Sequence, residues 1–139
     1  MSNQTLETNV TISGFSRIDF DRRKVRKSMR TLGRDVQKEA RRLVARRAIS
    51  GAGEYPGRQT GALWRAIKAK VSRSGFMVVV RPQKTAEMDF YYPAVLNSGS
   101  EKMNIKARKN YMTDALDRRR ENSRRVLRAT LQDALIPRK

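Results

Sequence analysis

One stretch decides the fold: Gly57-Arg58-Gln59-Thr60-Gly61-Ala62-Leu63-Trp64-Arg65-Ala66-Ile67. Apolar side chains recur in it at helical spacing, so we expect a short helix that docks by one face. The residue before Gly61 is Thr60, whose hydroxyl is predicted to cap this helix. Trp64 is the only tryptophan, and we expect it to be buried beneath the segment that follows. The predicted structural core here comprises Thr60, Gly61, Leu63, Trp64 and Ile67.

The residues that follow predict a β-hairpin. Residues 69–71 and 76–81 read as strands, and Ser72-Arg73-Ser74-Gly75 is typical of a turn. Residues 76–80 are apolar without alternation, so we expect both faces of that strand to be covered. Pro82 ends the strand.

A long basic helix is predicted before this region, over residues 21–49, with Asp19 or Asp21 as its cap. Its apolar stripe recurs every three or four positions, and consists of Val25, Met29, Leu32, Val36, Ala40, Leu43 and Val44. Most other positions are Arg or Lys, and we favour a face that meets something negative. Gly33 costs roughly 1 kcal/mol in mid-helix, which indicates close packing or a bend.

A second long helix is predicted over residues 111–135, ending before Pro137. Its middle, residues 117–125, has no large apolar side chain, so it is either exposed or packed against a polar partner. Four smaller features complete the chain: a strand over residues 8–15, a mobile loop over 50–59, a short helix between Pro93 and Gly99, and a basic loop over 100–110.

Composition limits the function. The chain has 139 residues, a net charge of +19 and a pI near 11.4, so we expect one domain and a polyanionic partner. His and Cys are absent, which removes the commonest catalytic bases and metal ligands. We expect no cofactor, metal or catalytic residue; the acidic pair Glu87 and Asp89 reads as a solvated loop. No apolar run approaches the ~20 residues of a membrane span, so we expect the chain to stay in a cytoplasm.

Two motifs resemble a known family. They are the 59–67 segment and Tyr91-Tyr92-Pro93-Ala94-Val95-Leu96-Asn97-Ser98-Gly99-Ser100. Both are similar to neck proteins of tailed bacteriophages, the tail-completion or minor tail components related to lambda tail protein Z. That family has a long basic helix, an Asp-Thr-Gly-Ala-Leu-like motif, a hairpin, a Tyr-Ala-X-X-X-Glu-X-Gly-like motif and a closing helix. Gln59 and Asn97 depart from its acidic positions.

The resemblance implies an α+β fold in which two long helices pack on a small antiparallel sheet with a central β-hairpin. It also implies a virion protein assembled in the host cytoplasm, a head–tail connector component without catalysis. Its expected state is a ring, with a hexamer favoured over a dodecamer. Expected neighbours are the head connector and the tail terminator or tail tube proteins, with genomic DNA in the lumen and no membrane. A single domain covers 1–139, with a strand and lead-in over 1–20 and a tail over 136–139.

Candidate partner-binding residues are aromatic or cationic, and are Tyr55, Arg58, Tyr91, Tyr92, Arg118, Arg119, Arg120, Arg124 and Arg125. The alternative is a basic protein that binds nucleic acid without sequence preference, through phosphates and some stacking. A third class, an assembly protein of another kind, also stays open. A ring of defined symmetry would separate the first class from the nucleic-acid binder.

Overall fold

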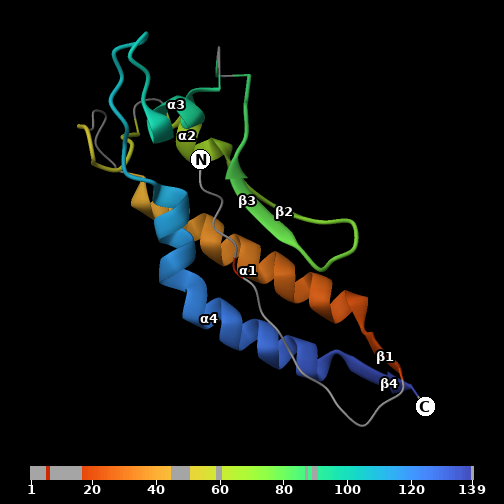
Figure 1. The fold of residues 1–139 in the computed structure, drawn as a ribbon. Helices are drawn as coiled ribbons and strands as arrows, with labels where there is room; N and C mark the ends of the chain where they lie inside the picture. The colour runs from red at the N-terminus through yellow and green to blue at the C-terminus, as the bar shows by residue number, and fades with distance from the viewer. Residues whose placement is uncertain are drawn as a thin grey trace.

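The computed structural model describes residues 6, 17–44, 51–58, 61–86, 88 and 91–138. Two long helices lie side by side, and a β-hairpin lies over the first of them (Figure 1). The elements are β1 (Arg17–Phe20), α1 (Arg22–Leu43), α2 (Ala62–Ala66), β2 (Ile67–Val71), β3 (Val78–Pro82), α3 (Tyr92–Ser98), α4 (Tyr111–Asp133) and β4 (Leu135–Arg138). The fold is α+β, as the sequence predicts.

Helix α1 begins where its cap was expected. The Asp21 carboxylate accepts hydrogen bonds from the backbone N–H groups of Arg23 and Lys24 at 3.1 and 3.5 Å. Six of the seven predicted stripe residues are buried and Met29 is partly buried, so the periodicity identified the inner face correctly. The helix ends at Leu43, because Val44 is extended. The remaining residues of the predicted helix, 45–49, lie outside the described residues.

Helix α4 runs antiparallel to α1 and joins it through polar as well as apolar contacts. The Arg119 guanidinium donates two hydrogen bonds to Asp35, at 2.7 and 2.9 Å. Ser28 and Thr130 share a hydrogen bond of 2.8 Å further along. The polar partner expected for the middle of α4 is therefore α1 of the same chain.

The hairpin packs on α1 at Gly33. A Cβ at this position would come within 2.5 Å of Val78 Cγ2 and 3.3 Å of Ala69 Cβ, so the glycine permits the close approach. The expectation that both faces of the second strand are covered is wrong. Met77 and Val79 are 57% and 39% exposed, because side chains alternate and only one face meets α1.

Helix α2 begins one residue later than predicted. Its N-cap position is Gly61, with φ of 81°, and this residue makes no side-chain cap hydrogen bond. The N-cap position is therefore one residue after the predicted Thr60, which lies outside the described residues. Leu63 and Ile67 are buried as expected, but Trp64 is only partly buried against the main cluster of core residues.

A second antiparallel sheet was not predicted. Strand β1 pairs with β4, with Arg17 opposite Arg138 and Phe20 opposite Leu135. The lead-in at 17–20 and the tail at 136–138 therefore lie in two paired strands, next to the first turn of α1 and the last turn of α4 (Figure 1). The helix predicted to residue 135 ends at Asp133. The strand predicted over 8–15 lies outside the described residues.

The described part of the glycine loop, which was predicted to be mobile, makes backbone hydrogen bonds to the loop after α3. Gly53 N donates to Ala107 O at 3.1 Å, and Lys109 N donates to Glu54 O at 2.8 Å. The basic loop after α3 thus supplies partners for the glycine loop. Helix α3 itself has Pro93 in its first turn and Gly99 at its exit, as expected.

Candidate interaction surfaces

Two guanidinium groups flank Trp64. The Arg41 Cζ lies 4.5 Å from the ring centroid and the Arg58 Cζ lies 5.0 Å from it. Both distances are within the range of a cation–π attraction. Arg58 is a predicted partner-binding residue, and the structure brings it to the predicted core tryptophan rather than into open solvent.

Arg41 fixes this arrangement to α1. Its Nη2 donates to the Ile67 carbonyl at 3.0 Å, and Gln37 Nε2 donates to the same oxygen at 2.7 Å. Burial lowers the pKa of Arg41, because a charged group loses solvation there. The arginine therefore acts as a structural tie between α1, Trp64 and the start of β2.

The predicted tyrosines also make internal contacts. The Tyr55 hydroxyl donates to Asp114 Oδ2 at 2.7 Å, and the Lys109 Nζ lies 4.8 Å from the Tyr55 ring centroid. Tyr91 donates its hydroxyl to the Pro82 carbonyl and is 39% exposed. Tyr92 is partly buried against the core. Of the three rings, Tyr91 offers the most surface to a partner.

Four of the six arginines of α4 pair with carboxylates of the same chain. Arg118 and Arg119 contact Glu39 and Asp35 of α1, at 3.5 and 2.7 Å. Arg120 pairs with Asp117 three residues earlier. The last two candidates, Arg124 and Arg125, contact Glu121 and Asn122 at 3.8 and 2.8 Å.

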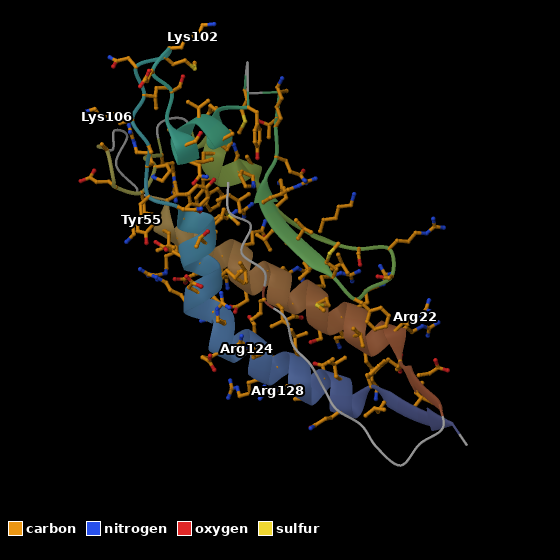
Figure 2. The ribbon with its side chains drawn as sticks, in the orientation of Figure 1. Arg22, Tyr55, Lys102, Lys106, Arg124 and Arg128 are labelled. Atoms are coloured by element: carbon orange, nitrogen blue, oxygen red, sulfur yellow. The ribbon has the colours of Figure 1, made fainter. Side chains whose placement is uncertain are left out.

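Figure 2 shows Arg124 on the side of α4 that faces away from α1. Arg120, Arg124 and Arg125 each bond to a residue of α4 itself, and therefore do not tie the two helices together. Their predicted role in binding a partner stays a prediction.

Glu39 lies at the centre of one ion cluster. Its carboxylate receives two hydrogen bonds from Arg42, at 2.6 and 3.1 Å, and also contacts Arg118. These cations, Arg42 first, lower the pKa of Glu39 despite its partial burial. The acidic residues that α1 does have are thus engaged on the side that faces α4.

A cationic surface remains on the free side of α1. All its members are exposed, and no carboxylate of a described residue lies within salt-bridge distance of them. They follow one another at steps of four, three, four and four residues, so they share one helical face. We call this set the α1 stripe: Arg23, Lys27, Arg30, Arg34 and Lys38.

A second, apolar surface lies on the hairpin. We call it the hairpin patch: Phe76, Met77 and Val79, which are 42%, 57% and 39% exposed. Met77 and Val79 point to the same side of β3 because side chains alternate. Phe76 also packs edge-on against Phe20, with ring centroids 6.4 Å apart. The periodicity of the sequence did not reveal this patch, since residues 76–80 are all apolar.

Lys68 and Lys70 of β2 are exposed beside this patch, because every second side chain of the strand lies on its outer face. Lys68 pairs with Arg81 across the hairpin, and Lys70 pairs with Val79. All four side chains are exposed, so the outer face of the hairpin combines apolar and cationic groups. That mixture is typical of a protein interface more than of a purely electrostatic contact.

Within the part of the chain that the structure describes, no group of three His, Cys, Asp or Glu side chains gathers to hold a metal ion. None of the described helices combines the length and the apolar character needed to cross a membrane. The acidic residues Glu87 and Asp89 lie outside the described residues. Comparisons with protein-family models, curated proteins and solved structures found no match for this chain.

Proposed function

We propose that this chain is a structural virion protein of a tailed bacteriophage, forming a neck or tail-completion ring between the head connector and the tail. Its neighbours in that position are the connector on one side and the tail terminator or tail tube on the other. The ring is proposed as a hexamer, with a dodecamer as the alternative. No catalytic step is part of this proposal.

The order of elements supports this proposal. The family resemblance implies a long basic helix, a Gly-Ala-Leu motif, a hairpin, a Tyr-Ala-like motif, a basic loop and a closing helix. Helix α1, helix α2, the β2–β3 hairpin, helix α3, the loop over 99–110 and helix α4 follow one another in that order. The resemblance also implies that the closing helix bears an Ala-Leu pair, and Ala115 and Leu116 lie in the first half of α4.

The hairpin patch is the observation that most directly supports the proposal of a ring. Among the described residues its sheet has two strands, and a two-stranded sheet is marginal without further cover. Exposed apolar side chains at such a site are typical of protein–protein contact. A neighbouring subunit in a ring would cover the patch and pair with the edge of β3 that meets no described strand.

Mass measurement in solution, followed by negative-stain imaging, tests the ring. Native mass spectrometry of the full chain, alone and mixed with its head-connector protein, should give one closed oligomer with rotational symmetry in projection. A chain that stays monomeric alone, with the connector and in purified particles would contradict the proposal.

Variants of the hairpin patch locate the interface. Met77→Gln with Val79→Thr keeps strand-compatible side chains while removing apolar surface, so it should dissociate the ring and leave a folded monomer. The matched control is Met103→Gln, which alters a 44% exposed methionine in the loop after α3. Equal dissociation by both variants would place the interface elsewhere.

A further inference from the structure

The charge of α1 is left unbalanced by the fold. Helix α1 contains ten basic and two acidic residues, and both acids are paired with arginines of α1 or α4. Helix α4 contains six basic and four acidic residues and neutralises several of them along its own surface. Excess positive charge is thus concentrated on the free side of α1. Such a surface attracts anions that the described part of the chain does not supply.

We infer that the α1 stripe binds the phosphate backbone of duplex DNA. The stripe is linear, and its end residues are fifteen positions apart, which is ~22 Å along a helix. Duplex DNA of that length carries about 13 phosphates, so each of the five cations can reach one. Arg22, beside the first stripe residue, also projects into solvent at the same end of α1 (Figure 2).

The composition of the stripe favours phosphate over a protein partner. Protein interfaces have an apolar, often aromatic centre, and the stripe contains only Arg and Lys. The exposed apolar surface lies on the hairpin instead. Phosphate contacts require only cations and hydrogen-bond donors, which matches what this face of α1 offers.

The same composition makes the contact independent of base sequence. Readout of bases in the grooves commonly uses Asn or Gln against adenine and Arg against guanine, at positions fixed by neighbouring contacts. The stripe has no Asn or Gln, and Gln37 beside it is engaged with the Ile67 carbonyl at 2.7 Å. A surface of flexible, exposed cations tracks the backbone and lets the duplex slide.

This inference concerns the single chain and does not require the ring. Fluorescence anisotropy with a labelled duplex of about 30 base pairs, titrated at several NaCl concentrations, measures it. Each phosphate contact contributes about −0.9 to the slope of log K against log salt. The wild-type chain should therefore give a slope of about −4 to −5, with similar affinities for two duplexes of unrelated sequence.

A triple variant assigns the contact to α1. Lys27→Gln, Arg30→Gln and Arg34→Gln together keep good helix formers at exposed positions, so circular dichroism should be unchanged. Binding should weaken at every salt concentration, and the slope should lose about 3 in magnitude.

The matched control is Lys102→Gln, Lys106→Gln and Arg128→Gln, which removes the same charge from the loop after α3 and from α4 (Figure 2). It should change the slope by less than about 1. The inference would be overturned if the salt slope fell equally in both triple variants. It would also be overturned if the wild-type chain bound no duplex at the lowest salt concentration. Mass measurements on the same samples report the ring separately, so either proposal can fail alone.

Discussion

Trp64 shows how one residue can serve packing and electrostatics together. Its ring contacts the core cluster and is flanked by Arg41 and Arg58. Indole offers the strongest cation–π partner among the side chains, so both guanidinium groups can be held near the ring although they carry like charge. The residue therefore links α1, α2 and the glycine loop at one point.

We expect Trp64→Ala to lower the free energy of unfolding by about 3 kcal/mol, at the lower end of the cost for buried aromatic truncations, because Trp64 is only partly buried. Trp64→Phe should cost about 1 kcal/mol, since it keeps a ring between the guanidinium groups. Urea unfolding followed by circular dichroism measures both. A change below about 1 kcal/mol for the alanine variant would show that the ring matters little to the fold.

Glu39 gives the stability of the α1–α4 pair a dependence on pH. Its pKa is lowered from 4.5, first by the hydrogen bonds from Arg42, so the folded state holds the ionised form more tightly than the unfolded chain. This stabilisation is complete above the ordinary pKa and is lost as the pH falls through the lowered value.

Glu39→Gln should therefore reduce stability at neutral pH and flatten its decline below about pH 4.5. Arg42→Gln should flatten the same decline, because it removes the largest cause of the shift. Urea midpoints measured between about pH 3 and pH 7 test this. If the urea midpoints of the wild type and the Glu39 variant fell in parallel with decreasing pH, the Glu39 cluster would contribute nothing to the pH dependence of stability.

At the scale of elements, the contact between α1 and the hairpin depends on one absent side chain. Gly33 lies under Val78 and Ala69 so closely that a methyl group has no room. A β-branched residue such as Val78 cannot turn aside freely, and overpacking of this kind typically costs about 1–3 kcal/mol. Glycine at this position destabilises the helix by roughly 1 kcal/mol relative to alanine, but it allows the hairpin to pack closely against α1.

Gly33→Ala should consequently destabilise the protein by about 1 kcal/mol, although alanine favours a helix by roughly that amount. Val78→Ala added to it should recover part of the loss, because it removes the clashing Cγ2. Thermal unfolding of the wild type, the two single variants and the double variant gives the coupling free energy between positions 33 and 78. A stabilised Gly33→Ala protein would show that the hairpin adjusts its position without cost.

Sequence reasoning predicted those elements whose signals are local. The stripe of α1, the turn at residues 72–75 and the limits of α3 follow from periodicity, glycine and proline, and the structure confirms them. The β1–β4 pair joins residues such as Arg17 and Arg138, whose distance along the chain leaves no local signal, and Pro137 argued against a strand.

The polar contacts between the long helices were hidden for a related reason. In the sequence, Arg118 and Arg119 read as candidates for binding a partner. Nothing local indicated that Asp35 and Glu39 would meet them, because pairing across helices depends on the relative rotation of the helices. Only the fold reveals that the acids of α1 and the arginines of α4 meet. This pairing also means that reversing Arg118 and Arg119 to Glu would disturb the α1–α4 contact before it reported on any partner.

At the scale of the whole molecule, net charge opposes the fold. The chain carries +19, and several ion pairs are exposed enough to contribute little each. Repulsion within the α1 stripe and between α1 and the hairpin lysines acts against the compact state. Salt screens both repulsion and attraction, so the response to salt reports which of the two is larger.

We expect repulsion to be larger, and therefore that the melting temperature rises by about 3–6 °C between about 0.05 and 0.5 M NaCl, which corresponds to roughly 1 kcal/mol. The experiment uses sodium chloride and not a sulfate salt, because sulfate also strengthens apolar burial. The Lys27, Arg30 and Arg34 to Gln variant should melt higher than wild type at low salt and respond less to added salt, because it removes three neighbouring charges. A melting temperature that falls with salt in the wild-type chain would show that pairs such as Asp35–Arg119 outweigh the repulsion, and the α1 stripe would then impose no energetic demand for an anionic partner.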